Sequence, residues 1–138
     1  MIFKNIKELK DYARDNDISN IKVVLRECTD EDIYNNLDIF KKITQLNINY
    51  TCVTKLPKEL VNLNELDCSV THIKEIPKEY INLEYLNCSR TKVSRISKEC
   101  VNIKELDCSW TKVSKIPKEL VNISRLNCYN SNIKFTMC

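Results

Sequence analysis

A twenty-residue repeat runs through the chain from Ile43 onward and constrains the fold more than any other feature of the sequence. In register, the units are ITQLNINYTCVTKLPKELVN, LNELDCSVTHIKEIPKEYIN, LEYLNCSRTKVSRISKECVN, IKELDCSWTKVSKIPKELVN and the incomplete ISRLNCYNSNIKFTMC. Residues 43–138 therefore contain four full units and a partial fifth. A unit of this length cannot bury an apolar face alone, so the units are expected to stack into a solenoid.

The apolar positions within a unit predict one short strand. They are the first, fourth, sixth, eleventh and fourteenth, occupied in the second unit by Leu63, Leu66, Cys68, Ile73 and Ile76. Only the fourth and sixth positions are two residues apart, as the alternation of a strand requires. We therefore predict a strand of about three to five residues there, with these two side chains pointing inward.

The return path of each unit must contain turns, although the sequence has no glycine. The fifteenth position is Pro57, Pro77, Ser97 or Pro117. Proline's fixed φ suits the start of a single helical or 3₁₀ turn, which we predict there. Asparagine recurs at the twentieth position and tolerates left-handed backbone better than most non-glycine residues. We predict a left-handed turn at each of these residues, which are Asn62, Asn82, Asn102 and Asn122.

With this pattern the chain resembles the leucine-rich-repeat family, whose motif is Leu-x-x-Leu-x-Leu-x-x-Asn, over about two thirds of its length. Its short cysteine-bearing units are similar to those of some large viruses of amoebae and of intracellular bacterial proteins. The resemblance implies an α/β fold, a right-handed solenoid with short parallel strands on its concave face. Two departures stand out: Cys replaces the second strand leucine, and a hydroxyl residue replaces the motif's Asn. Because a hydroxyl has one donor where an amide has two, the hydrogen bonds of this loop should differ.

Residues 1–42 do not follow the repeat, and their pattern predicts helix, strand and helix. Apolar spacing predicts an amphipathic helix over about residues 3–15 and a strand over residues 21–25. Val23 precedes Leu46 by 23 residues, so we expect this strand to extend the sheet of the repeats. Thr29 and the three acidic residues after it predict the start of a second helix, whose apolar stripe ends at Phe40.

Both ends of the solenoid need cover, because an end coil exposes its apolar layer. Residues 1–42 are predicted to be a helical N-terminal cap, continuous with residues 43–138 in one domain. The fifth unit stops at Cys138, which leaves Phe135 and Met137 to cover its last layer. As an alternative to binding another protein, we expect the chain to associate with a second copy of itself through this end and form a homodimer.

Charge and cysteine content narrow the classes of function. The net charge is +3, with 8 basic and 9 acidic residues in residues 1–42 and 14 and 10 in residues 43–138. This excess is too small to indicate nucleic-acid binding. No segment resembles a signal peptide or a membrane span, which predicts an intracellular, cytoplasmic protein, in the host cytoplasm for a viral one. The eight cysteines are then expected to be reduced thiols.

The sequence contains no arrangement that indicates catalysis or a cofactor. One column of the repeat is Cys68, Cys88, Cys108 and Cys128. Stacked strands place such residues in a row about 4.8 Å apart, whereas zinc needs four sulfurs around one point at about 2.3 Å. We interpret the column as small apolar side chains that fill a narrow coil. His72 is the only histidine and has no paired acid or nucleophile, so we expect no enzyme, metal or cofactor.

The predicted function is protein binding, because one surface column does not repeat. The eighth position is Tyr50, Val70, Arg90, Trp110 or Asn130, and Trp, Tyr and Arg dominate interface energetics. With the outward strand positions, the candidate partner-binding residues are Tyr50, Asp67, Tyr85, Arg90, Asp107, Trp110, Arg125 and Tyr129. Beside Arg90 lie four more basic residues, Lys92, Arg95, Lys112 and Lys115. These residues predict a basic edge of the sheet to which an acidic partner binds. The alternative is that the basic residues only keep the protein soluble and that Trp110 only packs on neighbouring side chains.

Overall fold

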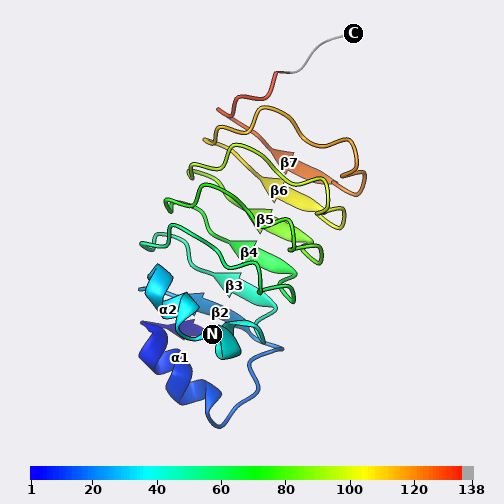
Figure 1. The fold of residues 1–138 in the computed structure, drawn as a ribbon. Helices are drawn as coiled ribbons and strands as arrows, with labels where there is room; N and C mark the ends of the chain where they lie inside the picture. Colours follow the sequence, from blue (N-terminus) through cyan, green and yellow to red (C-terminus); the bar gives the residue numbers. More distant parts are fainter. Residues whose placement is uncertain (135–138) are drawn as a thin grey trace.

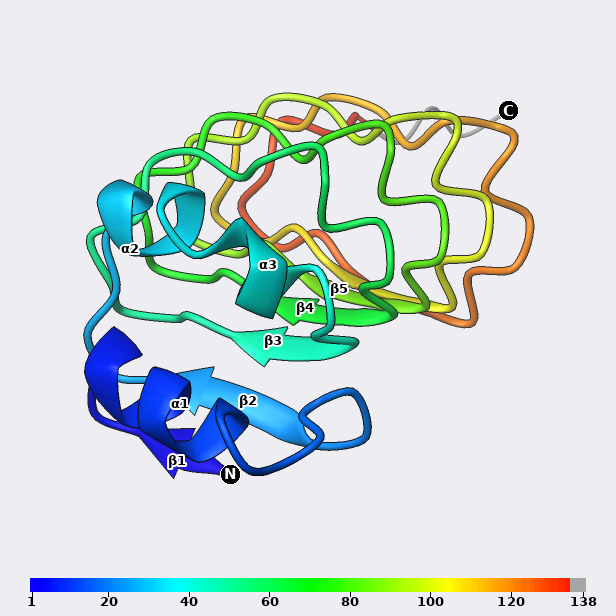
Figure 2. The ribbon, with the colours of Figure 1, turned by 60° about the horizontal axis from the view of Figure 1, so that its bottom comes forward.

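The computed structural model describes residues 1–134, which form a stack of coils with one parallel sheet along one side (Figure 1). Within this range seven strands follow one another in chain order. Their bounds are β1 Ile2–Phe3, β2 Lys22–Leu25, β3 Gln45–Asn47, β4 Glu65–Asp67, β5 Tyr85–Asn87, β6 Glu105–Asp107 and β7 Arg125–Asn127. Three short helices, α1 Ile6–Ala13, α2 Asp30–Tyr34 and α3 Leu37–Phe40, lie at the β1 end of the stack (Figure 2).

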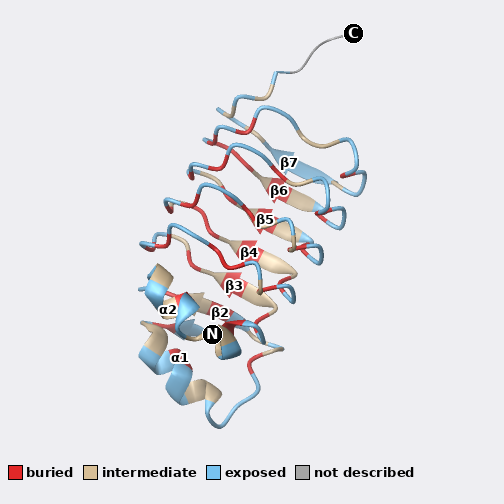
Figure 3. Cartoon of the chain, in the orientation of Figure 1, coloured by how far each residue is buried: buried red, intermediate tan, exposed pale blue. Residues whose placement is uncertain are grey.

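Each twenty-residue unit forms one coil, as the repeat predicts. The units pair in register, so that Leu66 lies opposite Leu46 on one side and Leu86 on the other. Each strand has three residues, and its central leucine is buried from β3 to β6 while the two flanking residues are half-buried. Buried residues recur at the same places in successive coils, so that the core is one continuous column (Figure 3).

The start of the chain differs from the prediction. The helix predicted over residues 3–15 is α1, which is shorter because the residues before it form β1. The carbonyl of Phe3 accepts a hydrogen bond from the N–H of Arg26 (3.0 Å), which ties the end of β1 to the residue after β2. Asn5 then caps α1, because its side chain accepts from the N–H of Glu8 (3.2 Å).

The segment between β1 and β3 follows the prediction with one interruption. β2 pairs with β3 in the expected register. Thr29 caps α2 in a capping box, in which its side chain accepts from the N–H of Asp32 and the Asp32 carboxylate accepts from the N–H of Thr29. The predicted single helix is divided into α2 and α3, because the side chain of Asn36 donates to the carbonyl of Asp32 (2.8 Å). That carbonyl would otherwise accept the next N–H of a continuing helix.

The left-handed residues of the coils are not the predicted ones. Positive φ occurs at the eighth position, three residues after the last residue of each strand, with values of 59° at Tyr50, 53° at Val70, 53° at Arg90, 55° at Trp110 and 53° at Asn130. The predicted residues do lie in turns, but none of them has positive φ, so the prediction of left-handed backbone is wrong for Asn62, Asn82, Asn102 and Asn122. These amides instead connect coils, since Asn82, Asn102 and Asn122 donate to the backbone carbonyls of Val61, Ile81 and Val101 at 2.8–3.0 Å.

Val70 has left-handed backbone, which is unfavourable for a β-branched residue and therefore lowers the stability of the fold. Asparagine tolerates this backbone, so an asparagine at position 70 should restore part of the lost stability. We expect Val70→Asn to raise the free energy of unfolding by about 0.5–1 kcal/mol, measured by urea denaturation followed by circular dichroism. Val101→Asn, at an exposed position with ordinary backbone, is the matched control and should not stabilise the protein. If the Val70→Asn protein were less stable than the wild type, the left-handed backbone at Val70 would not be a source of strain.

The hydroxyl residues of the ninth position close the loop after each strand. Each hydroxyl donates to the backbone carbonyl three residues earlier, at 2.5–2.7 Å, in Thr51, Thr71, Thr91, Thr111 and Ser131. In three of these units the same oxygen also accepts from the N–H two residues later, as Thr91 does from Val93 (3.4 Å). The loop bonding thus stays within one coil, which is why a single donor suffices.

The return path is built from turns rather than helices. The N–H of Tyr80 donates to the carbonyl of Pro77 (3.1 Å), and Leu120 and Cys100 make the same bond to Pro117 (3.1 Å) and Ser97 (3.2 Å). Each bond has the spacing of the predicted 3₁₀ turn, but it is not continued. Between α3 and residue 134 no helix is present.

Asp30 connects the first turn of α2 to the first full unit. Its carboxylate accepts from the N–H groups of Thr54 (2.7 Å) and Lys55 (3.2 Å) and from the Thr54 hydroxyl. Partial burial raises the pKa of Asp30, but the hydrogen bonds from Thr54 and Lys55 outweigh it and hold this pKa below its ordinary value. The ionised carboxylate therefore stabilises the junction.

The pH dependence of this contribution follows from the sign of the shift. Because the folded-state pKa of Asp30 lies below the unfolded value of about 3.9, its contribution is present above that pH and is lost as pH falls through the folded pKa. We expect Asp30→Asn to cost about 1 kcal/mol at neutral pH and to reduce the loss of stability on acidification. Urea denaturation at neutral and acidic pH measures both, with the exposed Asp38→Asn as the control.

Candidate functional site

Three of the predicted partner-binding residues form one cluster: Arg90, Trp110 and Tyr129. The guanidinium carbon of Arg90 lies 4.9 Å from the centroid of the Trp110 ring. The rings of Trp110 and Tyr129 meet edge to face, with centroids 5.9 Å apart and an angle of 64° between their planes. All three residues are exposed, Trp110 to 45% and Tyr129 to 71%. We call these residues the aromatic cluster.

The register of the coils places these side chains together. The N–H of Arg90 donates to the carbonyl of Ser109 (3.0 Å), and the N–H of Trp110 donates to the carbonyl of Tyr129 (2.9 Å). The backbone ladder thus continues one step beyond the strands into the left-handed turn. Arg90 and Trp110 occupy the eighth position of successive coils and are neighbours as a result. Tyr129 occupies the seventh position of the next coil, and its ring meets the Trp110 ring edge to face.

The other candidates lie apart from the aromatic cluster. Tyr50 is 75% exposed, but the coil that contains Val70 separates it from Arg90. Arg125 lies in β7 and makes an exposed ion pair with Glu105 in β6 (3.6 Å). Such a pair adds little stability and leaves Arg125 exposed on the sheet face.

Tyr85 occupies the centre of the acidic part of the sheet face. It is half-buried in β5, in register with Glu65 of β4 and Glu105 of β6. Burial raises the pKa of Tyr85 above its ordinary value, and the neighbouring carboxylates of Asp67 and Asp107 raise it further. The phenol therefore stays neutral at physiological pH among negatively charged neighbours.

Asp67 and Asp107 have a structural role that the sequence reasoning missed. The Oδ1 atom of Asp107 accepts from the N–H (3.0 Å) and the hydroxyl (2.6 Å) of Ser109, and Asp67 accepts from Ser69 with the same two distances. The asparagines at this fifth position accept the equivalent N–H in the other units. The fifth position thus starts the turn that ends each strand. Only Asp and Asn occur at this position, and this restriction could have indicated the turn-forming role from the sequence.

Five basic residues lie in the two coil segments that follow the left-handed turns, and we call them the basic edge: Arg90, Lys92, Arg95, Lys112 and Lys115. All five are exposed. The ion pairs found among residues 1–134 involve other cations, namely Arg14, Lys22, Lys104 and Arg125. The backbone N–H of Lys112 donates to the carbonyl of Val93 (3.0 Å), so the coils remain in register along this edge.

Three thiols of the cysteine column are in the core, and the fourth, Cys128, is half-buried against it. Cys68, Cys88 and Cys108 are fully buried, and burial raises the pKa of Cys108 to about 12 and those of the other two further above their ordinary value. Such thiols are protonated and act as small apolar side chains. Within the described residues no group of three or more His, Cys, Asp or Glu is placed to hold a metal ion.

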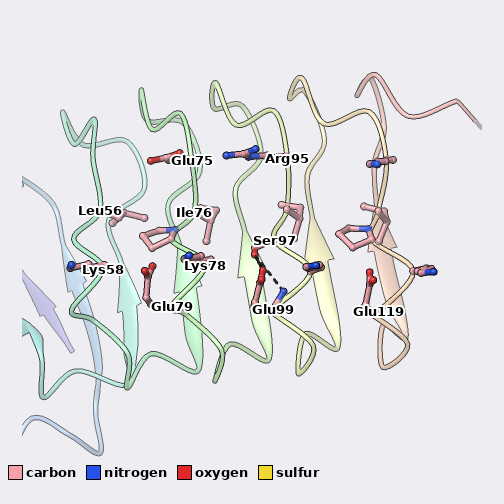
Figure 4. Close-up of a pocket in the computed structure, with 17 residues that line it drawn as sticks. Leu56, Lys58, Glu75, Ile76, Lys78, Glu79, Arg95, Ser97, Glu99 and Glu119 are labelled. Carbon is pink, nitrogen blue, oxygen red and sulfur yellow. Dashed lines mark hydrogen bonds between the residues drawn. The ribbon is translucent and has the colours of Figure 1, made fainter.

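A groove of about 1030 Å³ crosses the return path of the coils (Figure 4). Its side chains form rows across successive coils: Glu75 with Arg95, Leu56 with Ile76, Lys58 with Lys78, and Glu79 with Glu99 and Glu119. The Lys-Glu pairs of the return path line this groove, namely Lys78 with Glu79, Lys98 with Glu99 and Lys118 with Glu119. Because these pairs recur in each full unit, the groove has the same lining along the solenoid and does not indicate a specific binding site.

The last strand of the described range is less buried than the strand before it. Leu126 in β7 is 40% exposed, whereas Leu106 in β6 is 2% exposed. Phe135 and Met137, which were predicted to cover this layer, lie outside the described residues. Self-association through this end stays a prediction. In residues 1–134 no helix has the length and apolar character that crossing a membrane requires.

The chain matches no protein-family model and no curated protein. Solved structures are similar to it: the functional domain of InlJ from Listeria monocytogenes, described as including a cysteine ladder (TM-score 0.69, 20% identity), covers 82% of this chain. An internalin, InlF, of the same organism covers 82% (TM-score 0.71, 18% identity), and a leucine-rich-repeat protein of Leptospira interrogans covers 71% (TM-score 0.63, 28% identity). This chain spans 25%, 36% and 28% of their lengths, respectively. These comparisons do not support the closer resemblance to viral repeats.

Proposed function

We propose that this chain, a leucine-rich-repeat protein, binds a protein partner through the aromatic cluster and the adjoining sheet face. The observation that carries the proposal is the packing of Arg90, Trp110 and Tyr129 on one another at an exposed surface. Arginine, tryptophan and tyrosine are the residues in which binding energy concentrates at protein interfaces. Their mutual contacts also restrict their rotamers before binding, which lowers the entropy cost of association.

The surroundings of the aromatic cluster fit an extended interface. Tyr85, Glu105 and Arg125 on the neighbouring strands supply polar and charged groups that are partly exposed, as at the rim of an interface. A stack of coils presents such groups in rows about 4.8 Å apart over several units. This surface suits a partner that contacts several coils at once.

The test is a comparison of partner capture by wild-type and variant chains. The immobilised wild-type chain is incubated with a lysate of the cell from which the sequence comes, and bound proteins are identified. For any partner that is captured, we expect the Arg90→Ala, Trp110→Ala double variant to weaken binding at least about thirtyfold, with an unchanged circular dichroism spectrum.

The matched control removes two basic residues from the return path, far from the sheet. Lys98→Ala with Lys118→Ala lies in the same two units and should leave capture unchanged. A partner held equally by the wild type and by the Arg90→Ala, Trp110→Ala variant would show that the aromatic cluster is not the binding site.

A further inference from the structure

We infer that the partner segment recognised beside the aromatic cluster is an acidic peptide, whose carboxylates bind Arg90 and the other residues of the basic edge. This inference rests on the proposed function and specifies its partner. It starts from Arg90, whose guanidinium carbon lies over the Trp110 ring, 4.9 Å from the ring centroid. A guanidinium has five N–H donors in a planar fork, and those that the ring does not cover match a carboxylate in a bidentate contact.

The side-chain donors of Arg90 have no partner among residues 1–134, in either a hydrogen bond or an ion pair. Trp110 thus holds the guanidinium in place from one side while its hydrogen-bonding edge stays free. A carboxylate placed there gains a charge-assisted contact, and the guanidinium loses little freedom because it is already held.

The charges within the two segments that form the basic edge have one sign. Residues 90–95 and 110–115 contain the five basic residues of the basic edge and no acidic residue. Their side chains are exposed and enter none of the ion pairs found in the described part of the chain. Because the two segments lie in adjacent coils, these charges are concentrated over a short distance and attract a segment that carries several carboxylates.

The sheet face next to the basic edge has the opposite sign, and this favours a peptide over a nucleic acid. Glu105 and Asp107 lie on β6, which leads into the turn of Trp110. Glu65 and Asp67 lie on β4, which pairs with the β5 strand that leads into the turn of Arg90. A nucleic acid carries a phosphate at every nucleotide, and a strand that crossed the surface would meet these carboxylates. A peptide can restrict its acidic residues to the basic edge and present neutral or basic residues to the sheet.

Trp110 is the only tryptophan in the chain, so its fluorescence reports binding at this surface alone. The experiment titrates wild-type protein with capped octaglutamate, and in parallel with an oligothymidylate of equal charge, at one fixed ionic strength. We expect octaglutamate to change the Trp110 emission saturably and to bind more tightly than the oligothymidylate. Arg90→Gln should weaken octaglutamate binding about tenfold and Lys112→Gln about threefold.

The control is Lys118→Gln, which removes the same charge from the same unit on the return path and should leave the affinity unchanged. Equal weakening by Lys118→Gln and Lys112→Gln would show a general charge effect and overturn the inference. Tighter binding of the oligothymidylate, or no response to octaglutamate, would overturn it as well. The proposed function is judged separately, by whether the Arg90→Ala, Trp110→Ala variant loses its captured protein.

Discussion

Tyr80→Ala is expected to lower the free energy of unfolding by about 3–5 kcal/mol, because it empties a large volume in the middle of the core. Tyr80 lies at the eighteenth position of the second unit and is 0% exposed. Its hydroxyl donates to the carbonyl of Pro57 in the preceding coil (2.7 Å). The residue thus combines the packing of a ring with a hydrogen bond that connects two coils.

Tyr80→Phe separates the two contributions. It keeps the ring and removes the donor, which leaves the carbonyl of Pro57 without this partner and should cost about 1–2 kcal/mol. Urea denaturation followed by circular dichroism measures both variants. Tyr50→Ala is the control, because Tyr50 is 75% exposed and its removal should change stability by less than about 0.5 kcal/mol. Equal stability of Tyr80→Ala and Tyr50→Ala would contradict the assigned packing.

The coil architecture was predictable because the same weak signal occurs in every unit. A three-residue strand such as Glu65–Asp67 has too little pattern to be recognised alone. Five aligned copies of the leucine at the fourth position, with an inward residue two places later, make the strand and its register evident. The same reasoning placed Val23 opposite Leu46, which the structure confirms.

The errors arose where the intrinsic preference of a residue competes with the geometry of the stack. Asparagine prefers left-handed backbone more than tryptophan or valine does, yet Trp110 and Val70 adopt it and Asn102 does not. The chain must turn within three residues of the end of each strand, and that requirement overrides the side chain's preference. At the N-terminus, Ile2 fits a helical spacing as well as a strand, and only its pairing with Val24 decides between them.

The candidate site was predictable as a set of columns but not as a set of contacts. The change of residue class along the eighth position is enough to indicate Arg90 and Trp110. Their stacking, and the separation of Tyr50 from them, depend on side-chain geometry that a repeat pattern does not contain. The turn-forming role of Asp107 likewise depends on the position of the Ser109 hydroxyl.

Removal of residues 1–42 is expected to abolish cooperative unfolding or to lower the midpoint of thermal unfolding by more than about 10 °C. In the full chain, β2 covers the first full unit, and Ile43, Leu46 and Ile48 of that unit are at most 1% exposed. Without β2 these side chains would meet water, at a cost of about 1.5–3 kcal/mol for each. The contacts of Asp30 with the same unit would be lost as well.

The decisive comparison is removal of residues 63–102, two whole units of nearly equal length. This deletion joins Asn62 to Ile103 and recreates the junction that every pair of units makes, so no new apolar layer is exposed. A solenoid is stabilised by contacts between neighbouring units, so this deletion should lower the free energy of unfolding only by the contribution of two units. The shortened protein should still unfold in one cooperative transition. Thermal unfolding followed by circular dichroism distinguishes the two cases. If both deletions lowered the midpoint equally, residues 1–42 would contribute only as further length of solenoid, and the role of an N-terminal cap would be wrong.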